Sequence, residues 1–516
     1  MSDLRPNILL ISTDQQRADH LGCYGAQGLK TPNIDSIAKT GTRYDRAYVT
    51  SPVCMPNRSS IVTGRMPSLH GVRHNGLNLA LNSRTFIDVL RKDGYQTSLS
   101  GKAHFQCVTQ NPALIGGDLA NQAYCANIGR YDQETGALWR QTSDRRMDLP
   151  YYGLNHIDLA VGHGDQVDGH YNQWVADQGA DLDALRGPDH AHASGACPLF
   201  QAWRTKVPED LYPTRFVQEM TEKALSRYAQ EASQPFFHWA SFCDPHHPFT
   251  PPGQYWDMYA PDEVELPASF SAITADSMVS ALHDVRKAGG ANLQGTAAVA
   301  VTETELRWAT ALTFGLISMV DDAVGAILSA LKTNDQQRNT IVIFLSDHGD
   351  LMGDHGLLFK GPLHYQSVIR MPLLWHDPRA PQSAVCDDLV SAVDVSASIL
   401  HAAGAEPFHG MNGRTSLSDK ATPKRDAILI EDEVQFNLPA TDVRGRARTL
   451  VTQRWRFTLF DSLEKGEMFD LENDPMETVN KWDDPACAAQ QADLTERLLR
   501  ELIAHSETGA LPEFAA

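Results

Sequence analysis

The sequence lacks an ordered cysteine framework. Secreted domains stabilised by disulfides carry dense cysteines at regular spacing, and no C-x-x-C pair occurs here. We therefore expect free thiols and a cytoplasmic location. The eight cysteines are Cys23, Cys54, Cys107, Cys125, Cys197, Cys243, Cys386 and Cys487.

The sequence also lacks a long apolar run and an excess of positive charge. No stretch of about 18 apolar residues is present, which predicts no membrane span. The apolar run in the opening "MSDLRPNILLIST" is too short for a signal peptide. The 44 Lys and Arg residues face 64 Asp and Glu residues, a net charge of −20. This balance argues against nucleic-acid binding but not against a small anionic substrate, because a few local cations can oppose the overall charge.

Hydrophobic strands alternate with helical patterns over most of the chain. Residues 7–13 and 341–347 are continuous apolar runs that each end in Asp, as in strands buried on both faces of a parallel sheet. This alternation predicts an α/β fold with a doubly wound, mostly parallel sheet between helices. The other expected elements are helices at 31–41, 84–94, 213–231 and 306–333 and strands at 95–102 and 235–242.

The pattern changes after about residue 420, and this change suggests a second domain. Shorter strands are expected in 449–461 and 467–471, followed by a helix at 492–506. We therefore predict a main domain at 1–420 and a smaller α+β domain with an antiparallel sheet at 421–516. Segment 153–197, rich in Gly, His and Asp, is expected to be a surface insertion or lid.

Polar residues follow the predicted strands where ligands bind in such sheets. Asp14 and Asp347 end two of the strands and are followed by Gln15 and His348. Two carboxylates, an amide oxygen and an imidazole suit a divalent cation, and the imidazole moves the preference from Ca²⁺ towards Mn²⁺ or Zn²⁺. For either Asp alone, capping of the next helix is the simpler interpretation.

The stretch "SPVCMPNRSS" places Cys54 close before a predicted helix start. Helix amides and the positive end of the dipole would then lie beside the thiol, with Arg58 one turn further on. Such a thiol is expected to have a lowered pKa and to be nucleophilic. Most cysteines, however, are simply small buried apolar groups.

"CMPNR" (54–58) resembles the C-x-P-x-R signature of the sulfatase family, within the alkaline-phosphatase superfamily. The resemblance covers roughly residues 5–410, with a weaker match at 468–480. The further blocks, in the expected order, are "DQQRADHLGCYG" (14–25), "SGKAHF" (100–105), "DPHHPF" (244–249), "SDHGDLMGDHG" (346–356) and "FKGPLHYQS" (359–367). The resemblance implies an alkaline-phosphatase-like fold with a large mixed, mostly parallel sheet.

The resemblance also implies a modification of Cys54. In sulfatases this Cys is oxidised to formylglycine by a formylglycine-generating enzyme that reads the Cys, Pro and Arg of the motif. The aldehyde hydrate binds the metal through one hydroxyl, which attacks the sulfur of a sulfate monoester. The implied metal ligands are Asp14, Gln15, Asp347, His348 and the modified Cys54.

The family's other site residues carry over onto matching positions. Arg58 would steady the aldehyde hydrate, and Lys102 would contact the sulfate. His104 would act as base on the second hydroxyl. Lys360 or His246 would protonate the leaving oxygen and bind the sulfate, with His247 as a weaker alternative to His246. Asn75 would contact the substrate.

The chain departs from the common family pattern at two positions. Many sulfatases have a second Asp where this chain has Gln15, and Asn where it has His348. These substitutions resemble the branch of choline sulfatases and phosphonate monoester hydrolases. We therefore expect one Ca²⁺ or Mn²⁺ ion and an arylsulfatase-like sulfatase. The alternatives are a phosphonate monoester or phosphodiester hydrolase, an enzyme acting on both ester types, and an inactive binding protein.

Family members are often dimers or tetramers, so a homo-oligomer is expected.

Other clusters are expected to be structural. The histidines of 153–197 match no metal-ligand spacing and are assigned to a polar lid; they include His156, His163, His170, His190 and His192. Asp321 and Asp322 are expected on an exposed helix face or at a subunit contact. Trp455, Phe457 and Phe460 are expected in the core of the second domain. Recognition of the substrate's alcohol is expected from 105–200, 250–300 and the C-terminal domain.

Overall fold

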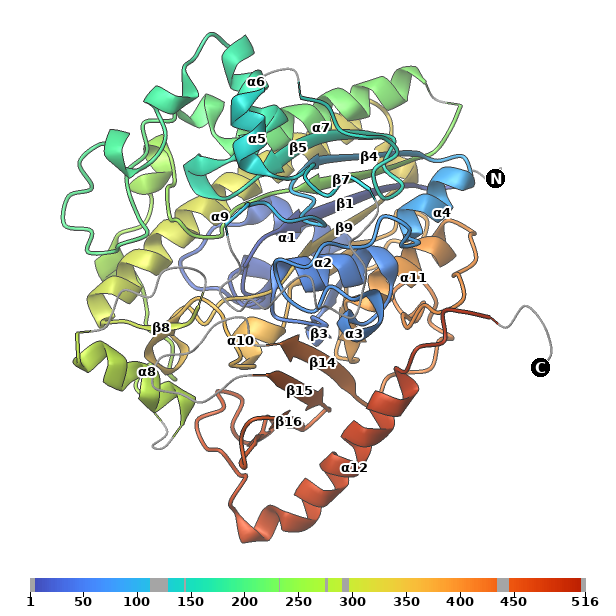
Figure 1. Cartoon of the computed structure of the whole chain (residues 1–516). Coiled ribbons are helices and arrows are strands. Elements are labelled where there is room, and N and C mark those ends of the chain that lie inside the picture. Colours follow the sequence, from blue (N-terminus) through green and yellow to red (C-terminus); the bar gives the residue numbers. More distant parts are fainter. Residues whose placement is uncertain are drawn as a thin grey trace.

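A nine-stranded sheet forms the centre of the protein (Figure 1). The computed structural model describes residues 5–111, 129–142, 145–231, 233–273, 277–289, 297–433 and 445–511. In spatial order the strands are β12 (Ala384–Cys386), β2 (Thr42–Tyr44), β11 (Leu373–His376), β9 (Thr340–Ser346), β1 (Asn7–Thr13), β7 (Phe236–Ser241), β4 (Gln96–Gly101), β5 (His156–Val161) and β6 (Asp168–Gly169). The run from β9 to β5 is parallel, while β11 and β6 are antiparallel to their neighbours. The predicted mixed, mostly parallel sheet is confirmed.

Helices cover both faces of this sheet because its central strands are apolar on both sides. In β1, Ile8 and Leu10 face one core and Leu9 and Ile11 the other, all fully buried. The first core is covered by α2 (Cys54–Thr63), α4 (Phe86–Lys92) and α11 (Val393–Ala402), and the second by α1 (Pro32–Thr40), α7 (Pro213–Gln230) and α9 (Glu303–Thr333).

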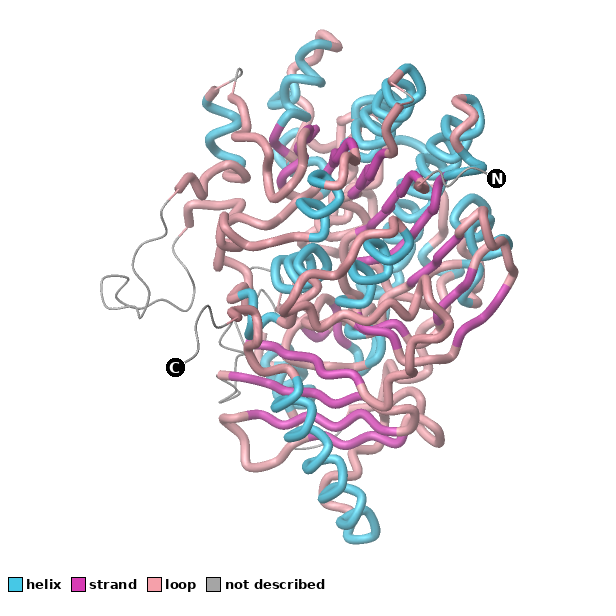
Figure 2. The backbone as a smooth tube through the Cα atoms, turned by 90° about the vertical axis from the view of Figure 1, so that its right-hand side faces the viewer, coloured by secondary structure: helices cyan, strands magenta, loops and turns pink. Residues whose placement is uncertain are grey.

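The C-terminal part forms a separate antiparallel sheet, seen at the bottom of Figures 1 and 2. Trp455 and Phe457 are buried in the core of this part, as predicted. Phe460 is buried instead in a cluster made mostly of main-domain side chains such as Leu282 and Leu351. Residues 449–461, expected to contain strands, span most of a hairpin. The strands are β14 (Ile428–Glu433), β15 (Arg446–Val451), β16 (Trp455–Phe460) and β17 (Glu467–Asp470), and α12 (Ala488–Ala504) packs against β14 and β15. The boundary at 420/421 stays a prediction.

Segment 153–197 differs from the predicted insertion. Residues 156–161 form β5, which pairs in parallel with β4, and α6 (His170–Asp177) follows the short edge strand β6. The polar composition concealed a short strand whose apolar side chains Ile157 and Leu159 enter the core. Residues 156–161 and 168–169 are therefore part of the main sheet rather than a lid over it, and the assignment of the segment after α6 stays a prediction.

Helix α9 also departs from expectation at Asp321, which is buried rather than exposed. Its carboxylate accepts hydrogen bonds from the backbone N–H groups of Asn33 (3.1 Å) and Ile34 (2.8 Å) at the start of α1. Among the described residues, α9 is the one helix long and apolar enough to cross a bilayer, a feature that the sequence analysis missed. Of its most apolar window, 72% is buried inside the protein, as is usual for a core helix.

Candidate active site

Two acidic side chains meet where the neighbouring parallel strands β1 and β9 end. Asp14 follows β1 and Asp347 follows β9, and the paired residues Thr13 and Ser346 bring them together. Both carboxylates are buried, and the backbone N–H of Gln15 donates to Asp347 Oδ1 at 3.1 Å. The predicted convergence at the carboxyl ends of the strands is present in the structure.

Helix α2 carries the cysteine into this centre. The helix begins at Cys54 itself, and Cys54 Sγ lies 3.7 Å from Asp14 Oδ1 and 3.1 Å from His348 Nε2. Asn57 fixes the first turn, because its Nδ2 donates to the Asp347 carbonyl at 2.5 Å and its Oδ1 accepts from Thr50 N at 2.9 Å. The motif is therefore folded around the acidic pair.

Arg58 reaches the same point one helical turn later. Its Nε donates to Asp347 Oδ2 at 2.7 Å, and its Nη1 donates to the Lys102 carbonyl and Ser241 Oγ, each at 2.9 Å. Its Nη2, 3.7 Å from Asp14 Oδ2, has no hydrogen-bond partner among the described residues although the side chain is fully buried. One guanidinium N–H group is therefore available to a ligand.

The thiol of Cys54 is not the acidic group that the sequence suggested. Burial and the neighbouring Asp14 carboxylate raise its pKa to about 11, against the opposing charges of Lys360 and Lys102. The prediction of a lowered pKa is therefore wrong for the unmodified side chain. A helix N-terminus stabilises a thiolate only where desolvation does not outweigh it.

Four side chains offer donor atoms suited to a divalent cation. The side-chain donors of Asp14, Cys54, Asp347 and His348 all lie within 4.8 Å of one another. His348 Nδ1–H donates to the Gly349 carbonyl at 2.8 Å, which leaves Nε2 as the donor that faces the acidic pair. Gln15 Oε1 adds an amide oxygen beside this group. Lys360 Nζ donates to Gln15 Oε1 at 2.7 Å and lies 3.0 Å from His348 Nε2, so both atoms contact the same ammonium. This set of two carboxylates, an amide and an imidazole fits a divalent metal.

Lys102 places a positive charge directly on Asp14, to which its ammonium donates a hydrogen bond. Burial alone would raise the pKa of Asp14. The charges of Lys102 and Arg58 hold that pKa well below its usual value, so Asp14 is ionised.

His104 follows β4 in a left-handed backbone conformation (φ 62°). Its turn is held by Glu134, a buried residue that the sequence analysis missed. Glu134 Oε2 accepts from His104 N at 2.6 Å, and Oε1 accepts from Phe105 N at 2.8 Å, Gln106 N at 3.0 Å and Tyr151 Oη at 2.6 Å. His104 Nδ1 is buried without a hydrogen-bond partner among the described residues.

Lys360 and His246 lie together beside the cysteine. Lys360 Nζ is 3.3 Å from Cys54 Sγ and 3.3 Å from His246 Nε2. His247 instead has its Nδ1 3.2 Å from Gln15 Nε2, so the geometry favours His246 as the residue paired with Lys360.

His163 belongs to the site, contrary to its assignment to a polar lid. Its Nε2 accepts from Lys102 Nζ at 2.6 Å, and its ring stacks on that of His246 at 3.6 Å. No motif marks it, because the pairing of β5 with β4 brings its loop to the site.

Asn75 lies next to the start of α2, where its side chain binds the backbone. Its Oδ1 accepts from Met55 N at 3.1 Å, which satisfies one free amide of the first turn of α2. Its substrate contact stays a prediction.

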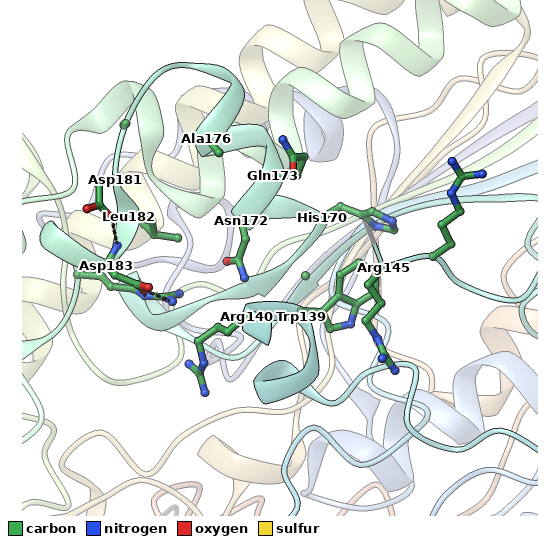
Figure 3. A pocket seen from close by; sticks show the side chains of 14 residues that line it. Trp139, Arg140, Arg145, His170, Asn172, Gln173, Ala176, Asp181, Leu182 and Asp183 are labelled. Carbon is green, nitrogen blue, oxygen red and sulfur yellow. Dashed lines mark hydrogen bonds and ion pairs between the residues drawn. The ribbon is translucent and has the colours of Figure 1, made fainter. Parts of the chain in front are cut away.

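A separate cavity of about 510 Å³ lies between α5 (Gly136–Gln141) and α6 (Figure 3). None of the residues that surround Asp14 and Asp347 lines it. Three of its arginines are paired: Arg140 with Asp168 at 3.0 Å, Arg145 with Asp132 at 3.2 Å and Arg186 with Asp183 at 2.5 Å. This cavity is distinct from the buried centre.

Comparisons with known proteins show which family the chain belongs to. The sulfatase family model matches residues 6–405, and a model described as N-sulphoglucosamine sulphohydrolase, C-terminal, matches residues 353–504. The chain is 27% identical to an arylsulfatase of Clostridium perfringens over 92% of this chain and 90% of that protein. It is also 27% identical to a choline-sulfatase of Rhizobium meliloti over 96% and 86% of the two chains. The fold resembles the phosphonate monoester hydrolase of Agrobacterium radiobacter, with a TM-score of 0.76 and 24% identity over 98% and 96% of the chains.

Proposed function

This chain belongs to the sulfatase family and is a sulfuric ester hydrolase, and we propose that it hydrolyses sulfate monoesters with formylglycine at position 54 and one divalent ion. The observation that carries the proposal is the position of Cys54, against Asp14 and His348 and at the start of the helix that also supplies Arg58. An arylsulfatase-like substrate, an aryl sulfate, is the simplest test compound.

The cation and the modified residue supply two elements of the chemistry. Asp14, Gln15, Asp347 and His348 would hold the ion. When bound, the ion supplies Lewis-acid activation and formylglycine supplies a nucleophilic hydroxyl. The imidazole of His348 favours Mn²⁺ over Ca²⁺.

Other residues of the site would bind the negatively charged sulfate or transfer protons. Arg58 Nη2 and Lys102 Nζ offer positive charge to the sulfate oxygens, in a buried site where such contacts are strong. Lys360, next to His246 Nε2, would donate a proton to the leaving oxygen. Burial keeps the pKa of His104 well below its usual value, so its neutral ring can accept a proton.

The same site could act on a phosphonate monoester or a phosphodiester. Gln15 and His348 replace the Asp and Asn of many sulfatases, and the resulting centre suits singly charged tetrahedral esters of either sulfur or phosphorus. This is our second candidate, and an enzyme that acts on both ester types is compatible with it.

A comparison of two substrates tests the proposal. We expect kcat/KM for nitrophenyl sulfate to exceed that for nitrophenyl phenylphosphonate, and Cys54→Ala to abolish both activities. A much larger kcat/KM for the phosphorus ester would favour the second candidate, and full activity of Cys54→Ala would exclude the mechanism.

Two further measurements address the modification and the ion. The peptide containing residue 54, from protein made in its native host, should weigh about 18 Da less than its cysteine form. Dialysis against a chelator should remove activity, and Mn²⁺ should restore it better than Ca²⁺. An unmodified thiol in active protein would contradict the proposal.

We propose in addition that the enzyme works in the cytoplasm as a dimer or tetramer, after maturation by a formylglycine-generating enzyme. All seven described cysteines are free thiols, which is consistent with a reducing compartment. Light scattering of the purified protein would measure the oligomeric state.

A further inference from the structure

A row of aromatic rings in successive contact includes His246 of the buried centre. His163 stacks on His246 with ring centres 3.6 Å apart, and His246 lies 4.1 Å from His247. The ring centre of His247 is 4.1 Å from that of Phe359, and the Phe359 ring is nearly perpendicular to that of Phe200, with the two centres 6.3 Å apart. The row therefore includes one member of the pair that handles the leaving oxygen, because His246 Nε2 lies 3.3 Å from Lys360 Nζ.

Only the two ends of this row reach solvent. The His163 side chain is 21% exposed and Phe200 is 46% exposed, whereas His246, His247 and Phe359 are 3% exposed or less. A substrate whose leaving oxygen lies between His246 and Lys360 must project its alcohol part out of the buried centre. His163 and Phe200 are the members of the row available to flank that part.

Asp165 ties the two ends to each other. Its backbone N–H donates to Thr250 Oγ1 at 3.1 Å, in the segment that also carries His246. Its Oδ2 accepts from Trp203 Nε1 at 2.9 Å and Thr205 Oγ1 at 2.7 Å, just after Phe200 in the chain. Because Asp165 is fully buried, the loops of His163 and Phe200 are held in a fixed relation.

We infer that His163 and Phe200 form two walls of the leaving-group subsite and that Phe200 determines a preference for aromatic over alkyl esters. This inference rests on the proposed function, because it uses the same buried centre. A planar aromatic alcohol can contact Phe200 through its ring, and a short alkyl group cannot make that contact.

Competitive inhibition by two sulfonates tests this subsite without changing the leaving group. Benzenesulfonate and methanesulfonate carry the same charge and differ only in the organic half. Phe200→Ala should raise the inhibition constant of benzenesulfonate roughly 3- to 10-fold, the worth of one aromatic contact. The inhibition constant of methanesulfonate should change less than about twofold, and Phe200→Tyr should restore benzenesulfonate binding.

Control variants separate a local effect from a general one. Ile503→Ala removes a side chain that is 73% exposed on α12 and should alter neither inhibition constant. His163→Phe should keep the preference for benzenesulfonate, and His163→Ala should reduce it. Equal changes for both sulfonates in Phe200→Ala, or no change for either, would overturn the inference.

A different measurement, the ester specificity of the wild-type enzyme, would show that the proposed function is wrong. If the wild-type enzyme hydrolyses only the phosphonate ester, the sulfatase proposal is wrong, and the same inhibition constants can be measured against that substrate. A lost aromatic preference in Phe200→Ala would then still support the subsite, and an unchanged preference would refute it.

Discussion

Replacing Glu134 by Gln should damage catalysis through His104 while leaving the rest of the site in place. In the wild-type protein Glu134 Oε1 accepts three hydrogen bonds, and Oε2 accepts one, from His104 N. A glutamine that keeps its oxygen at the Oε1 position must place its NH₂ group at the Oε2 position. That NH₂ group then faces the backbone N–H of His104, so two hydrogen-bond donors meet. His104, whose backbone is in the left-handed conformation, loses the hydrogen bond that its N–H makes in the wild-type protein.

The expected loss of stability follows from these bonds. A buried donor left without an acceptor costs about 1–3 kcal/mol. The three remaining bonds lose their charge assistance, which weakens each by roughly half. Together we expect the free energy of unfolding to fall by about 3–5 kcal/mol. Because a small misplacement of a catalytic group can cost about 100-fold, kcat should fall roughly 10- to 100-fold with little change in KM.

Asp321→Asn is a matched control. Asp321 is also a buried carboxylate that accepts backbone N–H groups, at the start of α1 rather than at the active site. Urea denaturation should show that both variants lose stability, and steady-state kinetics with nitrophenyl sulfate should show that only Glu134→Gln loses kcat. Wild-type kcat in a destabilised Glu134→Gln protein would refute the role of Glu134 in positioning His104.

Three other predictions concern the C-terminal sheet and the leaving group. Arg456→Met should lower the free energy of unfolding by about 3–5 kcal/mol in urea at pH 8, because it leaves buried Glu477 without its counter-charge. Arg454→Met, in a partly exposed ion pair two residues earlier in the chain, should cost much less, and equal losses would contradict the reasoning. Burial raises the pKa of Glu477 to about 7 against the charge of Arg456, so its contribution to stability is complete below its ordinary pKa of 4.5 and is lost as pH rises through 7. Glu477→Gln should therefore gain up to about 3 kcal/mol relative to wild type between pH 5 and pH 8, and a constant difference would argue against this shift. Lys360→Met should slow aryl sulfates with poor leaving groups more than those with good ones, and an unchanged dependence of kcat/KM on leaving-group pKa would exclude Lys360 as the acid.

The sequence predicted the main sheet and the acidic pair for one physical reason. Apolar runs that end in Asp14 and Asp347 must be buried strands, and parallel strands bring their carboxyl ends to one edge. The motif around Cys54 then indicated which helix completes the site. These features depend on local pattern and on simple topology.

The missed residues depend on contacts between distant segments. His163 reaches the site because β5 pairs with β4, and Glu134 reaches His104 from another loop, so no local spacing marks either residue. The pKa of Cys54 was predicted in the wrong direction because a helix start is visible in sequence, whereas complete burial is not. Asp321 was misplaced for the same reason, since its partners lie about 290 residues earlier in the chain.

The packing of α2 has a consequence for the timing of biosynthesis. Positions 54, 56 and 58 are all buried in the finished fold, with Cys54 2% exposed and Arg58 fully enclosed. An enzyme that recognises these three side chains can therefore bind them only in a nascent or unfolded chain. If position 54 is oxidised as proposed, the oxidation must precede folding, and a polypeptide that folds first would keep its cysteine even if a maturation enzyme were supplied later.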